Sequence, residues 1–138
     1  MRLNENSSRK DILNYIEIYL FEFLYNFSDK PWAQPYTDEA AKIYVQRSPR
    51  SFLNYFSHKP WAQPYIEEAA KEAAKVNPIR FLINFSNKPW AQPYIDDAAK
   101  GTAKKEPEYF MEKWADRFPQ YINLALFALG SENVSKSK

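Results

Sequence analysis

The heptad KPWAQPY occurs three times without change, at residues 30–36, 59–65 and 88–94. The copies begin at residues 30, 59 and 88, so the interval between them is 29 residues each time. Aligning the chain with itself at this interval extends the match well beyond the heptad. The further apolar columns are Phe23, Phe52, Phe81 and Phe110, and Leu24, Leu53, Leu82 and Met111. Such regularity restricts the chain to an architecture made of copies of one small unit.

Each copy has the pattern of two helices joined by a turn. Ser48 and Pro49 are typical of a helix start. Serine can cap the first turn with its side chain, and proline is tolerated in that turn because the amide hydrogen that it lacks would have no partner there. Asn77 and Pro78 repeat this start. We expect a single turn around Trp61 and then an alanine-rich second helix from about Pro64.

A single hairpin of this size cannot bury all of its aromatic residues. Stacking of hairpins would cover them, because each hairpin shields the open face of the one before it. We therefore predict that the heptad, with Trp61 at its centre, fills the wedge between successive units. The predicted fold is all-α, an α-solenoid of about four right-handed, stacked helical hairpins with a 29-residue repeat.

The expected boundaries follow from the same alignment. Residues 1–8 and 131–138 have no apolar periodicity, and we predict that both are mobile ends of a single domain at 9–130. Within it we expect a long first helix at 9–27, repeats at 20–48, 49–77 and 78–106, and a diverged terminal repeat at 107–130.

The unit resembles a known class of repeat. A pair of helices of about thirty residues, with proline at the first helix start and alanine in the second helix, is similar to the short HEAT-like repeats of α-solenoid proteins, over roughly residues 20–129. The resemblance implies a scaffold or a binding surface.

Composition excludes several classes of protein. Cysteine is absent, so the chain has neither disulfides nor thiolate metal sites. The formal net charge is +2, too small to indicate a polyanionic partner by itself. The apolar run in residues 12–27 contains Glu17 and Glu22 and is too short to span a bilayer. The first ten residues have no secretory signal, so we expect a cytoplasmic protein without membrane contact.

The sequence contains no recognisable catalytic set, and we expect neither an enzyme, a cofactor, a bound metal nor a small-molecule substrate. His58 is the only histidine, and its column holds Asp29, Asn87 and Asp116. A position that accepts three polar residue types across four repeats, beside a helix start, is typical of a turn or a cap rather than of a catalytic group.

The heptad supplies the candidate binding residues. Stacking would place Lys30, Lys59, Lys88 and Arg117 in one row, and Gln34, Gln63 and Gln92 in a second row. Recent duplication together with packing would also explain these rows, since charged rows are usually solvated. If they are selected for binding, an extended peptide or single-stranded nucleic acid would suit them, the latter stacking on Trp or Tyr.

The two ends are more apolar than the capping repeats of a solenoid usually are. The candidate interface residues are Ile16, Leu20, Phe21, Leu124, Phe127 and Leu129. These helices could fold back over the nearest repeat and be buried, or they could form a surface for self-association or for a protein partner. We expect Gly130 to end the last helix. The predicted function is a structural or protein-interaction scaffold, a homo-oligomer through its ends; the alternative is a single-stranded nucleic-acid-binding repeat.

Overall fold

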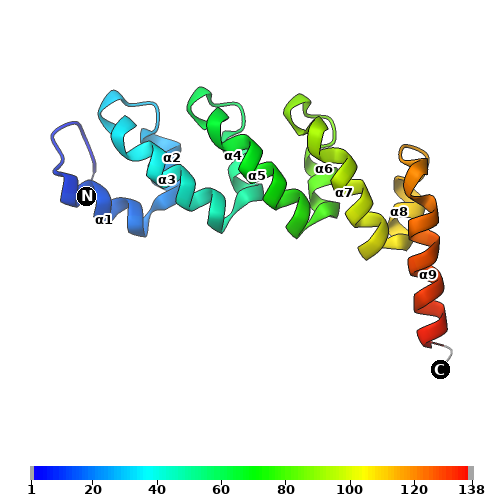
Figure 1. Cartoon of the computed structure of the whole chain (residues 1–138). Coiled ribbons are helices and arrows are strands. Elements are labelled where there is room, and N and C mark those ends of the chain that lie inside the picture. The colour runs from blue at the N-terminus through cyan, green and yellow to red at the C-terminus, as the bar shows by residue number, and fades with distance from the viewer. Residues whose placement is uncertain (1, 137–138) are drawn as a thin grey trace. The chain divides into compact units, whose positions relative to one another are not determined.

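The computed structural model describes residues 2–136, and it describes side chains for residues 2–130. Every regular element in this range is helical, which confirms the all-α prediction (Figure 1). The α-helices are α1 (Arg9–Ile18), α2 (Leu20–Phe27), α3 (Gln34–Arg47), α4 (Pro49–Phe56), α5 (Gln63–Val76), α6 (Pro78–Phe85), α7 (Gln92–Lys105), α8 (Pro107–Lys113) and α9 (Ile122–Lys136). Short 3-10 turns precede four of them: η1 (Pro31–Ala33), η2 (Pro60–Ala62), η3 (Pro89–Ala91) and η4 (Pro119–Tyr121).

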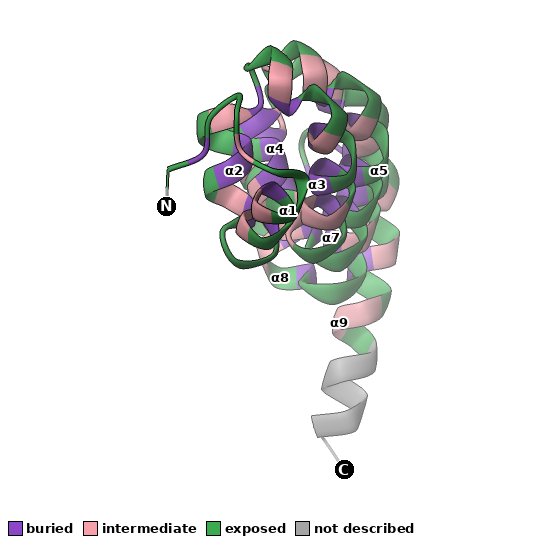
Figure 2. Cartoon of the chain, turned by 90° about the vertical axis from the view of Figure 1, so that its left-hand side faces the viewer, coloured by how far each residue is buried: buried purple, intermediate pink, exposed green. Residues whose placement is uncertain are grey.

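The chain divides into two compact units, Met1–Ala69 and Ala70–Lys138, and the boundary falls inside α5. In the first unit, α1 packs on α2, and α3 packs on both α2 and α4. Helices α2 and α4 lie on the same side of α3, with buried residues between them (Figure 2). In the second unit, α7 contacts α6, α8 and α9, and α8 also packs on α9.

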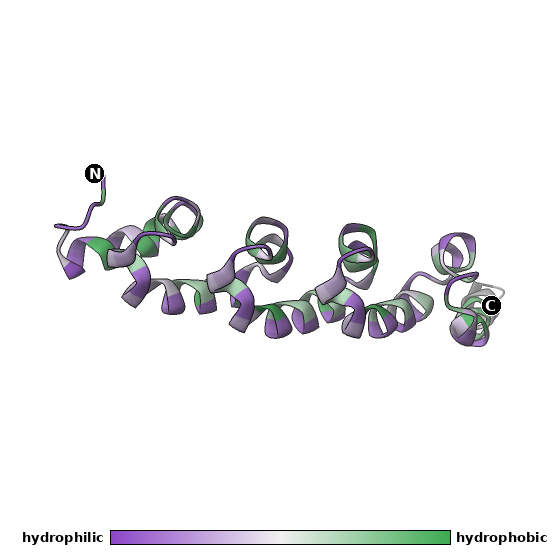
Figure 3. Cartoon of the chain, turned by 90° about the horizontal axis from the view of Figure 1, so that it is seen from above, coloured by the Kyte–Doolittle hydropathy of each residue, from purple (hydrophilic) through white to green (hydrophobic). Residues whose placement is uncertain are grey.

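The predicted apolar columns form the core of both units. Phe23, Phe52, Phe81 and Phe110 are each completely buried, as are Leu24, Leu53 and Leu82. Hydrophobic and hydrophilic residues alternate around the helices (Figure 3), as an amphipathic helix requires when one stripe faces a core. Each short helix makes too few turns to be stable alone in water, so its stability comes from burial of these side chains.

The predicted helix starts are largely confirmed. Helix α4 begins at Pro49, and α5 begins at Gln63, one residue before Pro64. The Asn77 side chain caps α6 by accepting a hydrogen bond from the Arg80 amide at 3.2 Å. Ser48 stands at the equivalent place but its side chain makes no capping bond, so the cap predicted there is wrong.

The predicted long helix at 9–27 is broken in two at Tyr19. This residue has φ −123° and ψ 55°, close to the φ −147° and ψ 67° of Ser48, which lies one repeat interval later. Helices α1 and α2 therefore meet at a corner whose backbone geometry is close to that of the corner between α3 and α4. Leu20 occupies the position of Pro49, so the sequence lacks the proline that marks the corner elsewhere.

The two ends also differ from the sequence prediction. Helix α9 continues through Gly130 to Lys136, so Gly130 does not end it, and its φ is not positive. Residues 137–138 of the predicted mobile tail lie outside the described residues, as does Met1. In the predicted mobile segment 1–8, Leu3 is buried and the Ser8 side chain caps α1 by accepting from the Asp11 amide at 3.1 Å. Among the described helices, none is long and apolar enough to cross a membrane.

Candidate functional site

The three heptads fold in the same way. Each begins with an extended lysine, with φ of −82°, −81° and −85° at Lys30, Lys59 and Lys88. Proline, tryptophan and alanine then form the 3-10 turn, and glutamine begins the long helix. The second proline lies at the first turn of that helix, where its missing amide leaves no bond unmade.

The repeated glutamine has a role inside the turn that the sequence prediction did not identify. The Gln63 amide nitrogen donates to the carbonyl oxygens of Ser57 at 2.9 Å and Lys59 at 3.0 Å. Gln34 and Gln92 make the same pair of bonds in their own turns. Carbonyl groups at the end of a helix lack partners within it, and the glutamine side chain supplies one to the serine carbonyl that follows each short helix. The lysine carbonyl also accepts from the alanine amide of the 3-10 turn, so the glutamine bond is its second. The sequence does contain a signal for these bonds, because serine and glutamine are separated by six residues in each of the three copies.

The ring contacts of the heptad tryptophans lie within their own hairpins. The Trp61 ring lies 5.3 Å from Phe56 and 6.0 Å from Phe52 between centroids. Trp90 is likewise 5.2 Å from Phe85. Tryptophan thus closes the hairpin to which it belongs, and its predicted place in the wedge between successive units stays a prediction.

Other aromatic residues join successive hairpins in the first unit. The Phe21 ring, from α2, lies 4.9 Å from Tyr55 and 5.8 Å from Phe56, both on α4. Tyr44, from α3, lies 6.0 Å from Phe56. Phe21 was predicted as an interface residue for a partner, and the structure places it half-buried in this internal contact.

Two of the four predicted binding cations have partners within the chain. The ammonium group of Lys59 lies 3.3 Å from the Asp29 carboxylate. The Arg117 guanidinium lies over the rings of Trp114 and Phe118, at 5.8 and 5.4 Å from their centroids. Lys30 lines a hollow of about 490 Å³ in the first unit, and Lys88 is exposed in the second.

Tyrosine hydroxyls reach carboxylates of the preceding repeat, a contact that the sequence analysis missed. Tyr65 donates to Asp38, and Tyr121 donates to Asp96. Burial and then the bond to Asp38 raise the pKa of Tyr65 to about 12. The bond to Asp96 and then burial raise the pKa of Tyr121 to about 12. The bond from Tyr65, followed by that from Lys42, holds the pKa of the Asp38 carboxyl below its ordinary value.

The predicted interface residues separate into buried and exposed groups. Ile16 and Leu20 are each only 8% exposed and belong to the core. Leu124 and Leu129 are half-buried, whereas Phe127 is 75% exposed. The sequence analysis missed Leu126, which lies beside Phe127 on α9 and is 50% exposed.

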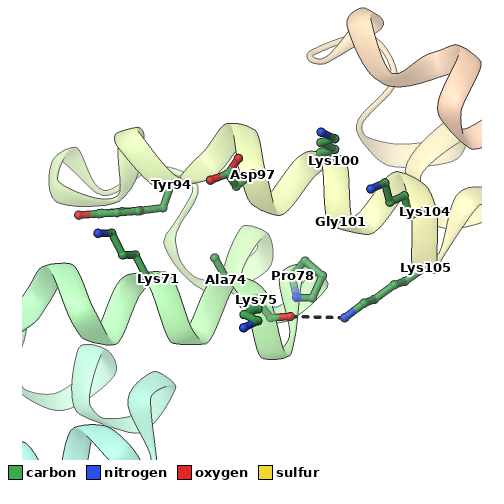
Figure 4. A pocket seen from close by; sticks show the side chains of 10 residues that line it. All are labelled: Lys71, Ala74, Lys75, Pro78, Tyr94, Asp97, Lys100, Gly101, Lys104 and Lys105. Atoms are coloured by element: carbon green, nitrogen blue, oxygen red, sulfur yellow. Dashed lines mark hydrogen bonds between the residues drawn. The ribbon is translucent and has the colours of Figure 1, made fainter.

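Grooves beside the long helices complete the candidate surfaces. One of about 320 Å³ lies between α1 and α3 in the first unit, and one of about 460 Å³ lies between α5 and α7 in the second (Figure 4).

Across the described residues, no group of three or more acidic or histidine side chains is placed to hold a metal ion. Comparisons with protein-family models, curated proteins and solved structures find no match to this chain.

Proposed function

We propose that the chain is a non-enzymatic scaffold whose hairpins stack as an α-solenoid of about four HEAT-like units. Support comes from the corner at Tyr19, which adds one more copy of the repeated geometry, and from contacts between successive hairpins in each unit. An elongated particle in small-angle X-ray scattering would support the stack, whereas a globular scattering profile would contradict it.

The identity of the heptads fits a scaffold because the fold uses their side chains. Tryptophan closes the hairpin, glutamine binds the turn, and Tyr65 contacts the preceding repeat. The alanine in the 3-10 turn of each heptad, at Ala33, Ala62 and Ala91, is completely buried, so a larger residue has no room there. Packing therefore gives a reason for the repetition without any ligand.

The scaffold self-associates, in this proposal, through the exposed face of α9. The observation that carries this is the pair Leu126 and Phe127, adjacent and exposed on a helix whose opposite side, at Ala125, is buried. No charged residue occurs between Arg117 and Glu132, so this part of α9 would bring no charged side chain of its own into an interface. Burial of an exposed Leu or Phe contributes about 1.5–3 kcal/mol, and a symmetric dimer would bury the side chain of both subunits.

Light scattering coupled to size exclusion tests the proposal at tens of micromolar chain. The wild-type chain is expected to be a dimer, and Phe127→Lys a monomer, because the substitution would place a charge in the interface. Ile83→Lys is the matched control, since Ile83 is also exposed, at 48%, but lies on α6. A wild-type monomer, or equal loss of the dimer in both variants, would contradict self-association through α9.

The alternative of single-stranded nucleic acid has less support in the structure. Bases stack on aromatic faces that are open to solvent, whereas the rings of Trp61 and Trp90 pack on phenylalanines. The pairing of Lys59 with Asp29 also removes one cation from the predicted row. This alternative stays a prediction, and a steep fall in affinity with salt would be its signature.

A further inference from the structure

The groove between α1 and α3 in the first unit combines an apolar surface with a balanced charge. Its aliphatic lining residues are Leu13, Ile16, Leu20, Ala40 and Ile43. Leu13 is 39% exposed and Ile43 is half-buried, so part of this apolar surface is open to solvent. The charged residues that line the groove are two arginines and two glutamates. An occupant without charge of its own therefore suits this groove better than a strongly charged one.

Leu13 departs from the repeat at an exposed position of this groove. At the 29-residue interval, the next three copies have lysine there, at Lys42, Lys71 and Lys100. Lys42 pairs with an acid one turn earlier, since its ammonium group lies 3.1 Å from the Asp38 carboxylate. In α1, Arg9 stands in place of that acid and Leu13 in place of that lysine. Because three copies have lysine at this position, the hairpin itself does not require leucine there.

Helix α9 departs from the repeat at the acidic members of the same pattern. The fifth and sixth residues of the three long helices that precede it are acidic: Asp38 and Glu39 in α3, Glu67 and Glu68 in α5, and Asp96 and Asp97 in α7. In α9 these two places hold Leu126 and Phe127, which are 50% and 75% exposed. Acid and lysine one turn apart share a helix face. That charged face is therefore apolar at Leu13 in the first copy, and at Leu126 and Phe127 in the last.

The two replacements leave apolar surfaces that match each other in chemistry. Exposed leucine and phenylalanine side chains are unfavourable in water, and contact between the groove and α9 would remove both surfaces from water at once. The groove has a volume of about 320 Å³, near the lower limit of small-molecule sites, and insertion of side chains from a helix suits that size. The part of α9 that carries Leu126 and Phe127 has no charged residue, in keeping with the balanced charge of the groove.

We propose that the groove between α1 and α3 receives Leu126 and Phe127 from α9 of a second copy of the chain. This inference rests on the proposed self-association through α9, and it names the surface that α9 meets. The two surfaces in contact are different, so two copies that exchange them form a closed dimer with two identical contacts, each made of one α9 and one groove. Leucine at position 13 and the Leu–Phe pair of α9 then have one common explanation.

Disulfide trapping between copies tests this contact, because the chain has no cysteine of its own. The full-length variants Leu13→Cys and Phe127→Cys are mixed at tens of micromolar and oxidised. We expect a disulfide between position 13 of one chain and position 127 of the other as the main product, identified by mass spectrometry of the tryptic peptides. Tyr25→Cys mixed with Phe127→Cys is the matched control, since Tyr25 is 62% exposed in the first unit but does not line the groove. Its crossed product should be at least about fivefold less abundant, because a disulfide forms only between closely placed residues.

Leu13→Lys tests the same contact without cysteine. It introduces the lysine of the next three copies, so the chain should fold, which circular dichroism checks. Sedimentation equilibrium should show a dimer dissociation constant at least about tenfold higher, because a charge would enter the contact. The control Asn14→Lys adds the same charge to α1 at an exposed position that does not line the groove, and it should change the constant by less than about twofold.

The results distinguish this inference from the proposed function on which it rests. A disulfide between two Phe127→Cys chains without the crossed product, or a dimer that tolerates Leu13→Lys as well as Asn14→Lys, would overturn the groove as the partner surface and leave self-association through α9 intact. Equal crossed products from Leu13→Cys and Tyr25→Cys would likewise overturn it. A monomeric wild-type chain would overturn both proposals and would leave the groove to an occupant other than a second copy.

Discussion

The hydroxyl of Tyr65 donates a hydrogen bond to the carboxylate of Asp38, 27 residues earlier in the chain. Tyr65 is the last residue of the second heptad, and Asp38 lies in the first turns of the long helix of the preceding repeat. The heptad thus has two structural functions, because its tryptophan and glutamine close one hairpin and its tyrosine joins that hairpin to the one before it. Tyr121 makes a similar bond to Asp96 in the second unit, although at the 29-residue interval it occupies the position of Gln63 rather than that of Tyr65.

Replacement of Tyr65 by phenylalanine is expected to lower the free energy of unfolding by about 0.5–1.5 kcal/mol, the usual net contribution of one hydrogen bond. The ring and its packing are kept, so the loss reports on the hydroxyl alone. Urea denaturation followed by circular dichroism measures the change. Tyr55→Phe is the control, since Tyr55 is 51% exposed and should tolerate the change with almost no loss.

The contribution of this bond should depend on pH at both extremes. The Tyr65 hydroxyl and Lys42 hold the pKa of Asp38 below its ordinary value of 3.8, so the stabilisation is present above about pH 4 and is lost as the pH falls through the lowered pKa. Burial and the bond to Asp38 raise the pKa of Tyr65 from 10.0 to about 12, so its stabilisation is complete below pH 10 and is lost as the pH rises toward 12.

The difference in unfolding free energy between wild type and Tyr65→Phe measures this dependence. It should be constant between about pH 5 and pH 9 and should shrink outside that range. Ultraviolet absorbance of tyrosinate locates the upper transition. A difference that stays constant through both extremes, or grows there, would contradict coupling of the two groups in the folded state.

Trp61→Ala should destabilise the chain by about 3–5 kcal/mol, because removal of a large ring leaves a cavity beside Phe52 and Phe56. Trp61→Phe should cost much less than Trp61→Ala. It keeps part of the ring contact and removes an indole N–H that is buried without a hydrogen-bond partner among the described residues. Thermal melts of the two variants distinguish this account from one in which Trp61 acts mainly as a ligand platform, where both substitutions would leave stability unchanged.

Simultaneous replacement of Lys30, Lys59 and Lys88 by glutamine should change stability by less than about 1 kcal/mol, because exposed or partly exposed ion pairs contribute little. The Lys59–Asp29 pair is the one contact expected to be lost. Chemical denaturation measures this, and a loss of several kcal/mol would show that the lysine side chains themselves hold the turns together.

The periodicity of the sequence predicts most of the helical framework. Pro49, Pro78 and Trp61 mark the corners and turns, and the structure forms them at or within a residue of the expected places. The apolar columns also predict the core, since Phe52 and Phe81 are fully buried. These features depend on local backbone preference and on helical period, both of which one sequence displays.

Other features depend on contacts that one sequence does not display. The corner at Tyr19 was missed because the following residue is Leu20 rather than proline, and the backbone bends there without that local signal. The glutamine bonds were missed because the side chain could equally face solvent. The Tyr65–Asp38 bond joins different repeats, so its recognition requires the register between hairpins rather than the repeat itself.

The central claim is that the repeated heptad is a structural element of the hairpin rather than a ligand-binding motif. Gln63→Glu tests it most directly, because glutamate keeps the shape of the side chain but cannot donate to Ser57 and Lys59 and sets a negative charge against their carbonyl oxygens. Urea denaturation should show a loss of about 1–3 kcal/mol. The control Gln46→Glu, at an exposed position on α3, should show almost none. Equal stability of Gln63→Glu and wild type would contradict the claim.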